Sequence, residues 1–474
     1  MNRVAAKNDH RADQTKVTDN PYSRGIAQFV SGLTYEKIPP EVRSRIKLLI
    51  LDTLGCGIYA SIKAHSKILI DTITSVDAAG TCGIWGTSSR VTAPHAALVN
   101  GTLIQGFELD DVHRRASMHV GAVTLPGVVA IAEIRPGMSG RHFMTAAVAG
   151  YEIGPRVGIC MGDDHLGQGW HSGATVGVFG GAASAAAALG LSEEKTIDAL
   201  GIAGTQASGL MAAQYGSMVK RMNHGKSAQS GLYAGLLANA GYTGIQNVFE
   251  SEFGGFCTTF SRSKDRFNMG ELTRGLGERW ETMQDSLKFY SSAGCVQTTL
   301  DAIQIMRKRH PFGPGQVERI VVHGSQVNKD HCFWEYVPSG MTNAQFCIPY
   351  IVATLLLEGD FFVDQVTEEK LADPERIALS RKLDFIADPK IIATGKRYMV
   401  RVEIHLTDGT RLEETVEAQR GSETKFASEN DVVSKFQKLV SHVFPSSRVS
   451  EIRDTVLGIE KLDDAAKLAR LLVV

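Results

Sequence analysis

The chain of 474 residues is 43% hydrophobic and 21% charged, so it can fill a large core, and a mainly disordered chain is excluded. Its 50 Lys and Arg residues are balanced by 51 Asp and Glu residues, and the net charge of -1 excludes a global basic field for binding nucleic acid. Seven scattered cysteines without a CxxC pair argue against a disulfide framework and a zinc knuckle, and favour a reducing cytoplasm. The length predicts two domains.

The N-terminal segment 1–20 is polar and mixed in charge, lacks the apolar run of a signal peptide, and is predicted to be a disordered tail. Pro39 and Pro40 then open a predicted helix over 41–60, because the first turn of a helix tolerates proline. The apolar run in this helix is interrupted by Asp52 and is shorter than the roughly 20 residues that span a bilayer. It predicts a buried helix, and no membrane association is expected.

From about 93 to 245 the chain is rich in Ala and Gly, and short polar breaks divide it. Gly173, Gly177 and Gly181 recur every four residues and precede Ala185, a pattern that on a helix lets another helix approach closely. These glycines do not follow GxGxxG, so a nucleotide site is not supported. The sequence predicts an all-helical domain over 21–284, with helices at 94–107, 121–134, 143–159, 172–190, 194–210 and 226–240.

After about 285 the pattern changes to alternating, β-branched segments. Segment 318–325 is typical of a strand, and segments 399–406 and 410–416 flank Asp408-Gly409, which indicates a hairpin with a two-residue loop. A smaller α+β domain is therefore predicted over 285–420. The last segment, 421–474, is again helical and is expected to pack back onto the first domain.

Ionisable residues gather in segment 106–126, between two apolar helices, and include Glu108, Asp110, Arg114 and His119. Their density favours a loop that faces a cleft, and a solvated loop is the alternative. No HExxH or paired-cysteine spacing supports a metal site.

His171 precedes the glycine-rich helix, where the helix dipole favours an anion; the alternative is a satisfied core histidine.

Basic residues gather at two further places. Lys220, Arg221, His224 and Lys226 fall within seven positions and form a cation cluster suited to carboxylates, with a solvated charged turn as the alternative. The GKS after His224 is not a phosphate-binding loop, because Lys220 stands where that motif requires glycine. Lys288 lies where the helical pattern ends, and either projects into an interdomain cleft or is a surface lysine.

Five collinear stretches resemble the MmgE/PrpD family: LILDTLGCGIYAS, ELDDVHRRASMHVGAVTLP, GWHSGATVGVFGGAASAAAALGL, DALGIAGTQASGLMAAQYGSMVKRMNHG and the segment around Lys288. The resemblance implies a mainly α fold, in which both chain ends form a large helical domain and a smaller α+β domain acts as a lid. It also implies a homodimer and catalysis without metal or organic cofactor. Matched by position, the implied active-site residues are Asp110, His119, His171, Lys220, Lys288 and Tyr350.

Two departures from the family pattern concern substrate choice. Ala293 and Gln297 stand where family members often carry histidine, and glutamine cannot shuttle a proton near neutrality. Arg114 and Arg115 add positive charge to the acidic loop. We therefore expect Gln297 and Arg114, together with His224, to contact the substrate.

The resemblance implies a cofactor-free lyase for a small di- or tricarboxylate, with decarboxylation of cis-aconitate or a close analogue as the leading expectation. Lys220 and Lys288 would bind carboxylates, His119 or His171 would deliver the proton, and Tyr350 would orient the substrate. Asp110 would hold a histidine or lysine in place. A 2-methylcitrate-type dehydratase, a dicarboxylate epimerase and a non-catalytic homologue are the alternatives.

Overall fold

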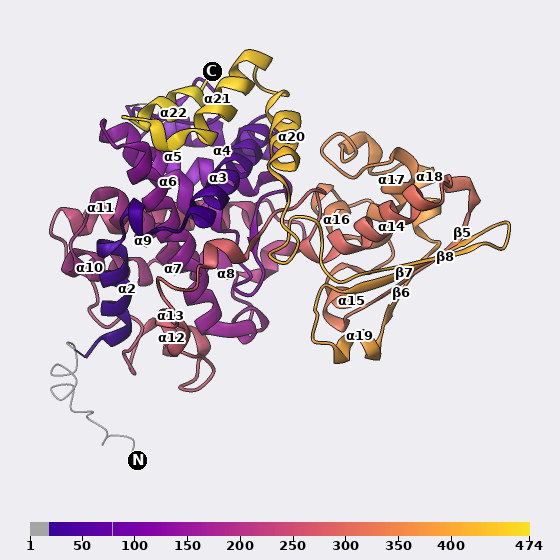
Figure 1. The fold of residues 1–474 in the computed structure, drawn as a ribbon, viewed down its shortest axis with the longest axis horizontal. Helices are drawn as coiled ribbons and strands as arrows, with labels where there is room; N and C mark the ends of the chain where they lie inside the picture. The colour runs from indigo at the N-terminus through magenta and orange to yellow at the C-terminus, as the bar shows by residue number, and fades with distance from the viewer. Residues whose placement is uncertain (1–18, 78) are drawn as a thin grey trace, which may run out of the picture.

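The computed structural model describes residues 19–77 and 79–474. It has a large helical body and a smaller body that carries a sheet (Figure 1). Residues 1–18 of the predicted tail lie outside the described residues. Asn20, at the end of that segment, is buried and its amide donates to the Gln246 carbonyl at 2.7 Å, so the ordered chain begins before residue 21.

The mainly α fold class is confirmed, and both chain ends build the helical body (Figure 1). Its C-terminal helices α20 and α21 contact α3, and α22 contacts α6. The helices are α2 (Pro21–Gly32), α3 (Pro40–Ala60), α4 (Ala64–Val76), α5 (Ala93–Ile104), α6 (Val120–Ile134), α7 (Gly140–Gly167), α8 (Ser172–Thr175), α9 (Gly177–Leu189), α10 (Glu193–Gly204), α11 (Val219–Asn239), α12 (Phe256–Ser261), α13 (Gly270–Thr273), α20 (Glu429–Val440), α21 (Ser446–Leu457) and α22 (Ala466–Leu471).

A buried ion pair ties the two ends of the chain together. Asp52 on α3 and Lys435 on α20 are both almost fully buried, and Oδ1 of the aspartate lies 2.6 Å from Nζ of the lysine. The same Nζ donates to the Leu109 carbonyl at 2.6 Å. The aspartate that interrupts the apolar run therefore anchors a lysine from the opposite end of the chain, beside the acidic loop.

Helix α11 is buried between α5 and α9, and small residues allow this close packing. A Cβ on Gly181 would lie 3.2 Å from the Gly231 Cα, and one on Gly101 would lie 2.8 Å from the Gly225 Cα. The predicted helix over 172–190 is divided at Val176 into α8 and α9. Within the described part of the chain, Ser172–Leu189 is also long and apolar enough to cross a membrane, but 89% of it is buried inside the protein.

The smaller body contains a four-stranded sheet in the order β6-β5-β7-β8, where β6 pairs parallel to β5 and the other pairs are antiparallel. Its strands are β5 (Val317–Gly324), β6 (Leu383–Ala387), β7 (Val400–Leu406) and β8 (Arg411–Val416). Its helices are α14 (Gln297–Arg309), α15 (Gln326–Cys332), α16 (Met341–Phe346), α17 (Ile348–Glu358), α18 (Pro374–Ser380) and α19 (Pro389–Ala393).

The predicted hairpin is present, but its loop is longer than expected. The Leu406 N–H donates to the Thr410 carbonyl at 2.8 Å, so three residues form the loop instead of two. Gly409 has φ 87°, the left-handed conformation that such a loop requires of its last residue.

A short antiparallel pair brings the acidic loop to the Lys288 segment. Strand β3 (Val112–His113) pairs with β4 (Asp285–Ser286), with Val112 opposite Ser286. A second short pair, β1 (Cys82–Gly83) with β2 (Arg90–Val91), lies elsewhere in the helical body. The β3–β4 pair places two segments, far apart in sequence, on one wall of the space between the two bodies.

Candidate active site

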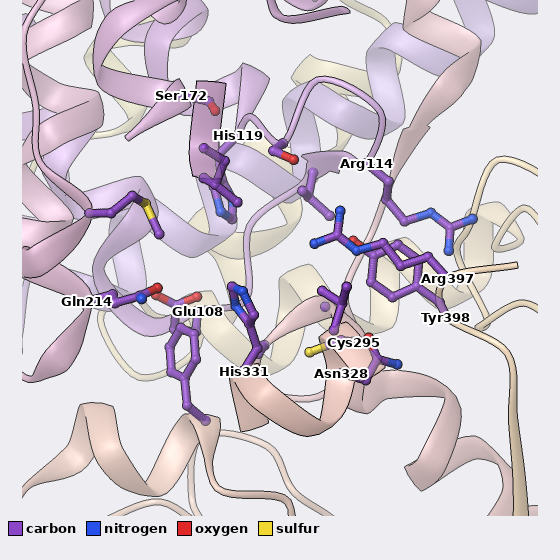
Figure 2. A pocket seen from close by; sticks show the side chains of 18 of the residues that line it. Glu108, Arg114, His119, Ser172, Gln214, Cys295, Asn328, His331, Arg397 and Tyr398 are labelled. Atoms are coloured by element: carbon purple, nitrogen blue, oxygen red, sulfur yellow. The ribbon is translucent and has the colours of Figure 1, made fainter. Parts of the chain in front are cut away.

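A pocket of about 160 Å³ lies where the helical body meets the α+β body (Figure 2). The helical body contributes the polar residues that the sequence singled out, and the α+β body contributes Cys295, Asn328 and Arg397. Clefts between domains are frequent ligand sites. Of the predicted site residues, His119, His171, Lys220, Lys288 and Arg114 line this pocket.

The acidic loop is a buried, fixed wall of the pocket. Asp111 accepts from the Gly121 N–H at 3.0 Å and from the Tyr151 hydroxyl at 2.7 Å, which fixes the loop at the start of α6. Glu108 adopts the left-handed conformation with φ 56°, directly after the short helix Gln105–Phe107. The loop therefore points its carboxylates inward, and the solvated alternative is excluded by the burial of Glu108 and Asp110.

Glu108 is the centre of a cation cluster. Its carboxylate forms a hydrogen-bonded ion pair with Lys220, and lies 3.6 Å from Lys288 Nζ and 3.9 Å from Arg221 Nη1. Burial alone would raise the pKa of the Glu108 carboxyl, but these three cations outweigh burial and hold its pKa well below the usual range. The cations that bind the Glu108 carboxylate would therefore also attract a carboxylate of a ligand.

The cation cluster is helical, not a charged turn. Helix α11 begins at Val219, seven residues earlier than predicted, so Lys220, Arg221 and His224 fall in its first two turns and are buried. Lys226 lies on the other side of the helix, is exposed, and donates to Gln229 at 2.8 Å. Of these four basic residues, Lys220 lines the pocket, Arg221 and His224 are buried behind it, and Lys226 faces away.

The hydrogen bonds of His119 determine which of its nitrogens is free. Nδ1 lies 2.7 Å from the Asp111 carbonyl oxygen, which can only accept, so Nδ1 carries a proton. Asp110 Oδ2 lies 3.1 Å from the same nitrogen. Nε2 forms no hydrogen bond with the described residues and is therefore available to a ligand in the pocket.

His171 and His224 have different environments from His119. Burial, reinforced by Lys220 and His119, lowers the pKa of His171 to about 3, so this imidazole is neutral near pH 7. His224 is fully buried between the other two rings, at centroid distances of 4.9 Å from His119 and 5.1 Å from His171. Burial keeps the pKa of His224 well below 6.5, and the residue does not line the pocket. The prediction that His224 binds substrate directly is therefore wrong.

Buried neutral histidines predict how stability depends on pH. The pKa is lowered to about 4 in His65 and His165 and to about 3 in His171, and it lies well below 6.5 in His224, each mainly by burial. In the unfolded chain these groups titrate near 6.5, so the unfolded state binds more protons below that pH. We expect stability to fall as pH drops from about 6.5 towards 4, by about 1.4 kcal/mol per pH unit for each such histidine. Urea denaturation at pH 7.5, 6 and 5 measures this, and a constant free energy of unfolding would contradict it.

Tyr350 is not brought to the pocket. Its ring stacks on Tyr336 at a centroid distance of 4.2 Å, and its hydroxyl donates to the Lys370 carbonyl at 3.1 Å. Residue 350 lies in the first turn of α17 and is fully buried in the core of the α+β body. The substrate-orienting role predicted for Tyr350 is therefore corrected to a packing role.

Gln297 is likewise a structural residue. Its Oε1 accepts from the N–H groups of Phe289 and Tyr290 at 3.1 and 3.2 Å, and its Nε2 donates to the Tyr290 carbonyl and the Ser292 hydroxyl at 2.9 and 2.8 Å. The side chain is buried and does not line the pocket. Gln297 therefore holds the segment that carries Lys288 in place. The predicted contact of Gln297 with the substrate is corrected to this structural role.

Replacing Gln297 with histidine is expected to destabilise the protein without changing its substrate. Imidazole cannot accept two N–H groups and donate two bonds in this place, and each buried group left unpaired costs about 1–3 kcal/mol. Urea denaturation measures the loss, and Gln297→Glu, which keeps the Oε1 acceptor but cannot donate to the Tyr290 carbonyl, should also be destabilised. A gain of activity on 2-methylcitrate at unchanged stability would contradict this interpretation.

Arg114 reaches the pocket edge, but its charge is already paired. Its guanidinium binds the Glu423 carboxylate with two hydrogen bonds, one of them at 3.0 Å, and lies 4.7 Å above the Tyr398 ring. Figure 2 shows its guanidinium turned away from the centre of the pocket, whereas that of Arg397 points inward. Arg114 therefore lines the pocket with its charge held by Glu423, and its contact with substrate stays a prediction. Sequence reasoning missed Arg397, which belongs to no motif.

This geometry, a buried cation cluster beside a histidine whose Nε2 is free, suits an enzyme that acts on small carboxylates. The sequence matches the MmgE/PrpD N-terminal domain over 24–268 and the MmgE/PrpD C-terminal domain over 290–461. The chain belongs to the MmgE/PrpD family.

Several curated relatives align with nearly the whole chain. The cis-aconitate decarboxylase of Aspergillus terreus is 34% identical, over 94% of this chain and 95% of that protein. The cis-aconitate decarboxylase of Mus musculus is 26% identical, over 95% of this chain and 93% of that protein. The mitochondrial 2-methylcitrate dehydratase of Yarrowia lipolytica is 22% identical, over 92% of this chain and 88% of that protein.

Proposed function

We propose that the protein is a cofactor-independent carbon–carbon lyase that decarboxylates cis-aconitate or a close analogue to an itaconate-like product. One observation carries the proposal. Lys220, Lys288 and Arg221 surround the carboxylate of Glu108, beside His119, whose Nε2 is free. The cis-aconitate decarboxylases of Aspergillus terreus and Mus musculus are more similar to the chain than the Yarrowia lipolytica dehydratase is. That order supports decarboxylation over dehydration.

The reaction needs charge stabilisation and one proton. The carbon–carbon bond to the carboxylate on the saturated arm breaks and CO2 leaves. The released electron pair forms a new terminal alkene, and the electrons of the original alkene move to the carbon beside another carboxylate. Lys220 and Lys288 stabilise the enolate-like charge that develops there, and the imidazolium of His119 donates a proton to that carbon from Nε2. Asp110 stabilises the imidazolium until the proton moves.

A dehydratase acting on a 2-methylcitrate-like acid is the second candidate. It needs a base to remove a proton and an acid to assist departure of hydroxide. His119 supplies one such group, but His171 stays neutral because burial lowers its pKa to about 3. A neutral imidazole donates a hydrogen bond but is a weak acid, so the pocket suits a reaction with one proton transfer better.

An NMR assay of the purified protein tests the proposal. Itaconate formed from cis-aconitate supports it, whereas dehydration of 2-methylcitrate without itaconate formation would replace it with the second candidate. No turnover of either acid would favour a non-catalytic homologue.

Within residues 19–77 and 79–474, no three His, Cys, Asp or Glu side chains are grouped to hold a metal ion, so we expect activity to survive exhaustive treatment with EDTA. Loss that one metal restores would contradict the cofactor-free mechanism.

We further propose a cytoplasmic homodimer, as the family resemblance and the cysteine content predict. Light scattering of the purified protein measures the assembly, and a monomer at micromolar concentration would contradict it.

A further inference from the structure

The pocket has a second polar wall, opposite the cation cluster, which the family motifs do not include. Arg397 lies between α19 and β7, and Asn328 lies on α15, so both belong to the α+β body. The Ser325 hydroxyl joins these two segments, because it accepts from the Asn328 N–H at 3.2 Å and donates to the Arg397 carbonyl at 3.0 Å. The backbones of the two residues are thereby fixed relative to each other.

Neither side chain forms a hydrogen bond through its polar groups within the described part of the chain, although the half-buried Arg397 guanidinium lies 5.6 Å from the centre of the Tyr398 ring. Asn328 is 1% exposed, and both its Oδ1 and its Nδ2 lack a hydrogen bond. The Arg397 Nε is also buried without an acceptor, and across the described residues no carboxylate forms an ion pair with this guanidinium. Buried polar groups in folded proteins are normally satisfied, and leaving them unsatisfied is costly. Two such side chains on one pocket wall therefore point to a ligand that satisfies both.

We propose that Arg397 and Asn328 form a second carboxylate-binding pole, which holds the middle carboxylate of the substrate, the one that neither leaves as CO2 nor stands beside the carbon that takes up the proton. A guanidinium binds a carboxylate with two parallel hydrogen bonds and so fixes its orientation, whereas lysines act as point charges. The Asn328 amide adds a donor for the same group. This inference rests on the proposed function, because it assigns the carboxylates of that substrate to the two walls.

The second pole determines substrate class. The lysines face the carboxylate beside which charge develops, and Arg397 holds a carboxylate that takes no part in bond breaking. A tricarboxylate reaches both walls and still presents a third group, whereas an acid without the middle carboxylate leaves Arg397 and Asn328 unpaired. The pole therefore selects tricarboxylates over shorter acids, since a site with unpaired buried polar groups discriminates strongly.

Binding of inert acids by calorimetry tests this without requiring turnover. The probes are tricarballylate, a saturated tricarboxylate, and glutarate, which lacks its middle carboxylate. We expect wild type to bind tricarballylate at least about tenfold more tightly than glutarate, and Arg397→Gln to weaken tricarballylate by about 10²-fold but glutarate by less than about threefold. Asn328→Asp, which adds a repelling charge at nearly constant volume, should act in the same direction. Lys396→Gln is the matched control, because Lys396 is exposed and paired with Glu417.

Each outcome supports or overturns the second pole. Equal weakening of both acids, or no weakening of either, would overturn it, as would wild type that binds both acids equally or neither. If Lys396→Gln weakens tricarballylate binding as much as Arg397→Gln does, the loss reflects long-range charge attraction. That result would also overturn the second pole. If wild type discriminates through Arg397 but makes no itaconate from cis-aconitate, the pole stands and the proposed function fails. Thermal unfolding of each variant shows that the fold is retained.

Discussion

Lys220→Met is expected to lower kcat/KM for cis-aconitate by about 10²–10³-fold. Lys220 is buried and forms a hydrogen-bonded ion pair with Glu108, so its removal takes a cation from a buried anion site. Truncating one member of a buried charge pair costs about 2–5 kcal/mol, and part of that cost comes from leaving the other charge unpaired. Steady-state kinetics measures the loss.

Two variants separate binding of the substrate from neutralisation of Glu108. Lys226→Met changes the same residue type on the exposed side of the same helix, and we expect unchanged kinetics. The double variant Lys220→Met with Glu108→Gln removes the unpaired charge, so it should recover thermal stability but not activity. Recovery of activity would show that Lys220 serves only to neutralise Glu108.

His119→Asn is expected to lower kcat by about 10²–10⁴-fold, the usual contribution of a general acid or base. The asparagine amide can still donate to the Asp111 carbonyl in place of Nδ1, so the loop is kept while the proton-exchanging Nε2 is lost. Steady-state kinetics of both proteins measures the loss, and an unchanged kcat in the variant would contradict the role of Nε2.

His171→Asn is the comparison that decides between the two histidines. The His171 imidazole is neutral because burial lowers its pKa to about 3, so its expected contribution is a hydrogen bond to substrate. Its loss should raise KM more than it lowers kcat. If His171→Asn abolishes turnover while His119→Asn retains it, the proton comes from His171 and the assignment is wrong.

Local signals in the sequence predicted much of the fold. Pro40 opens α3, the glycine stripe that begins at Gly173 packs against α11, and the strands around Asp408-Gly409 form a hairpin. Helix ends were less predictable. The basic residues after Val219 show no hydrophobic period, because α11 is buried on several sides by small residues, so the sequence does not predict the first two turns of this helix.

The sequence by itself indicated the segments that meet at the pocket: Asp110 and His119 lie in the acidic loop, and Lys220 and Lys288 lie near its Glu108. His171 packs against His224. Only the tertiary structure decided which side chains face the pocket. It paired Glu108 with Lys220, 112 positions away, and placed Arg397 on the opposite wall. It also withdrew Tyr350 and Gln297 into packing and hydrogen bonds. The reason is that local pattern fixes how a segment folds, whereas the partner of a buried polar group is set by segments that meet only when the two bodies are assembled.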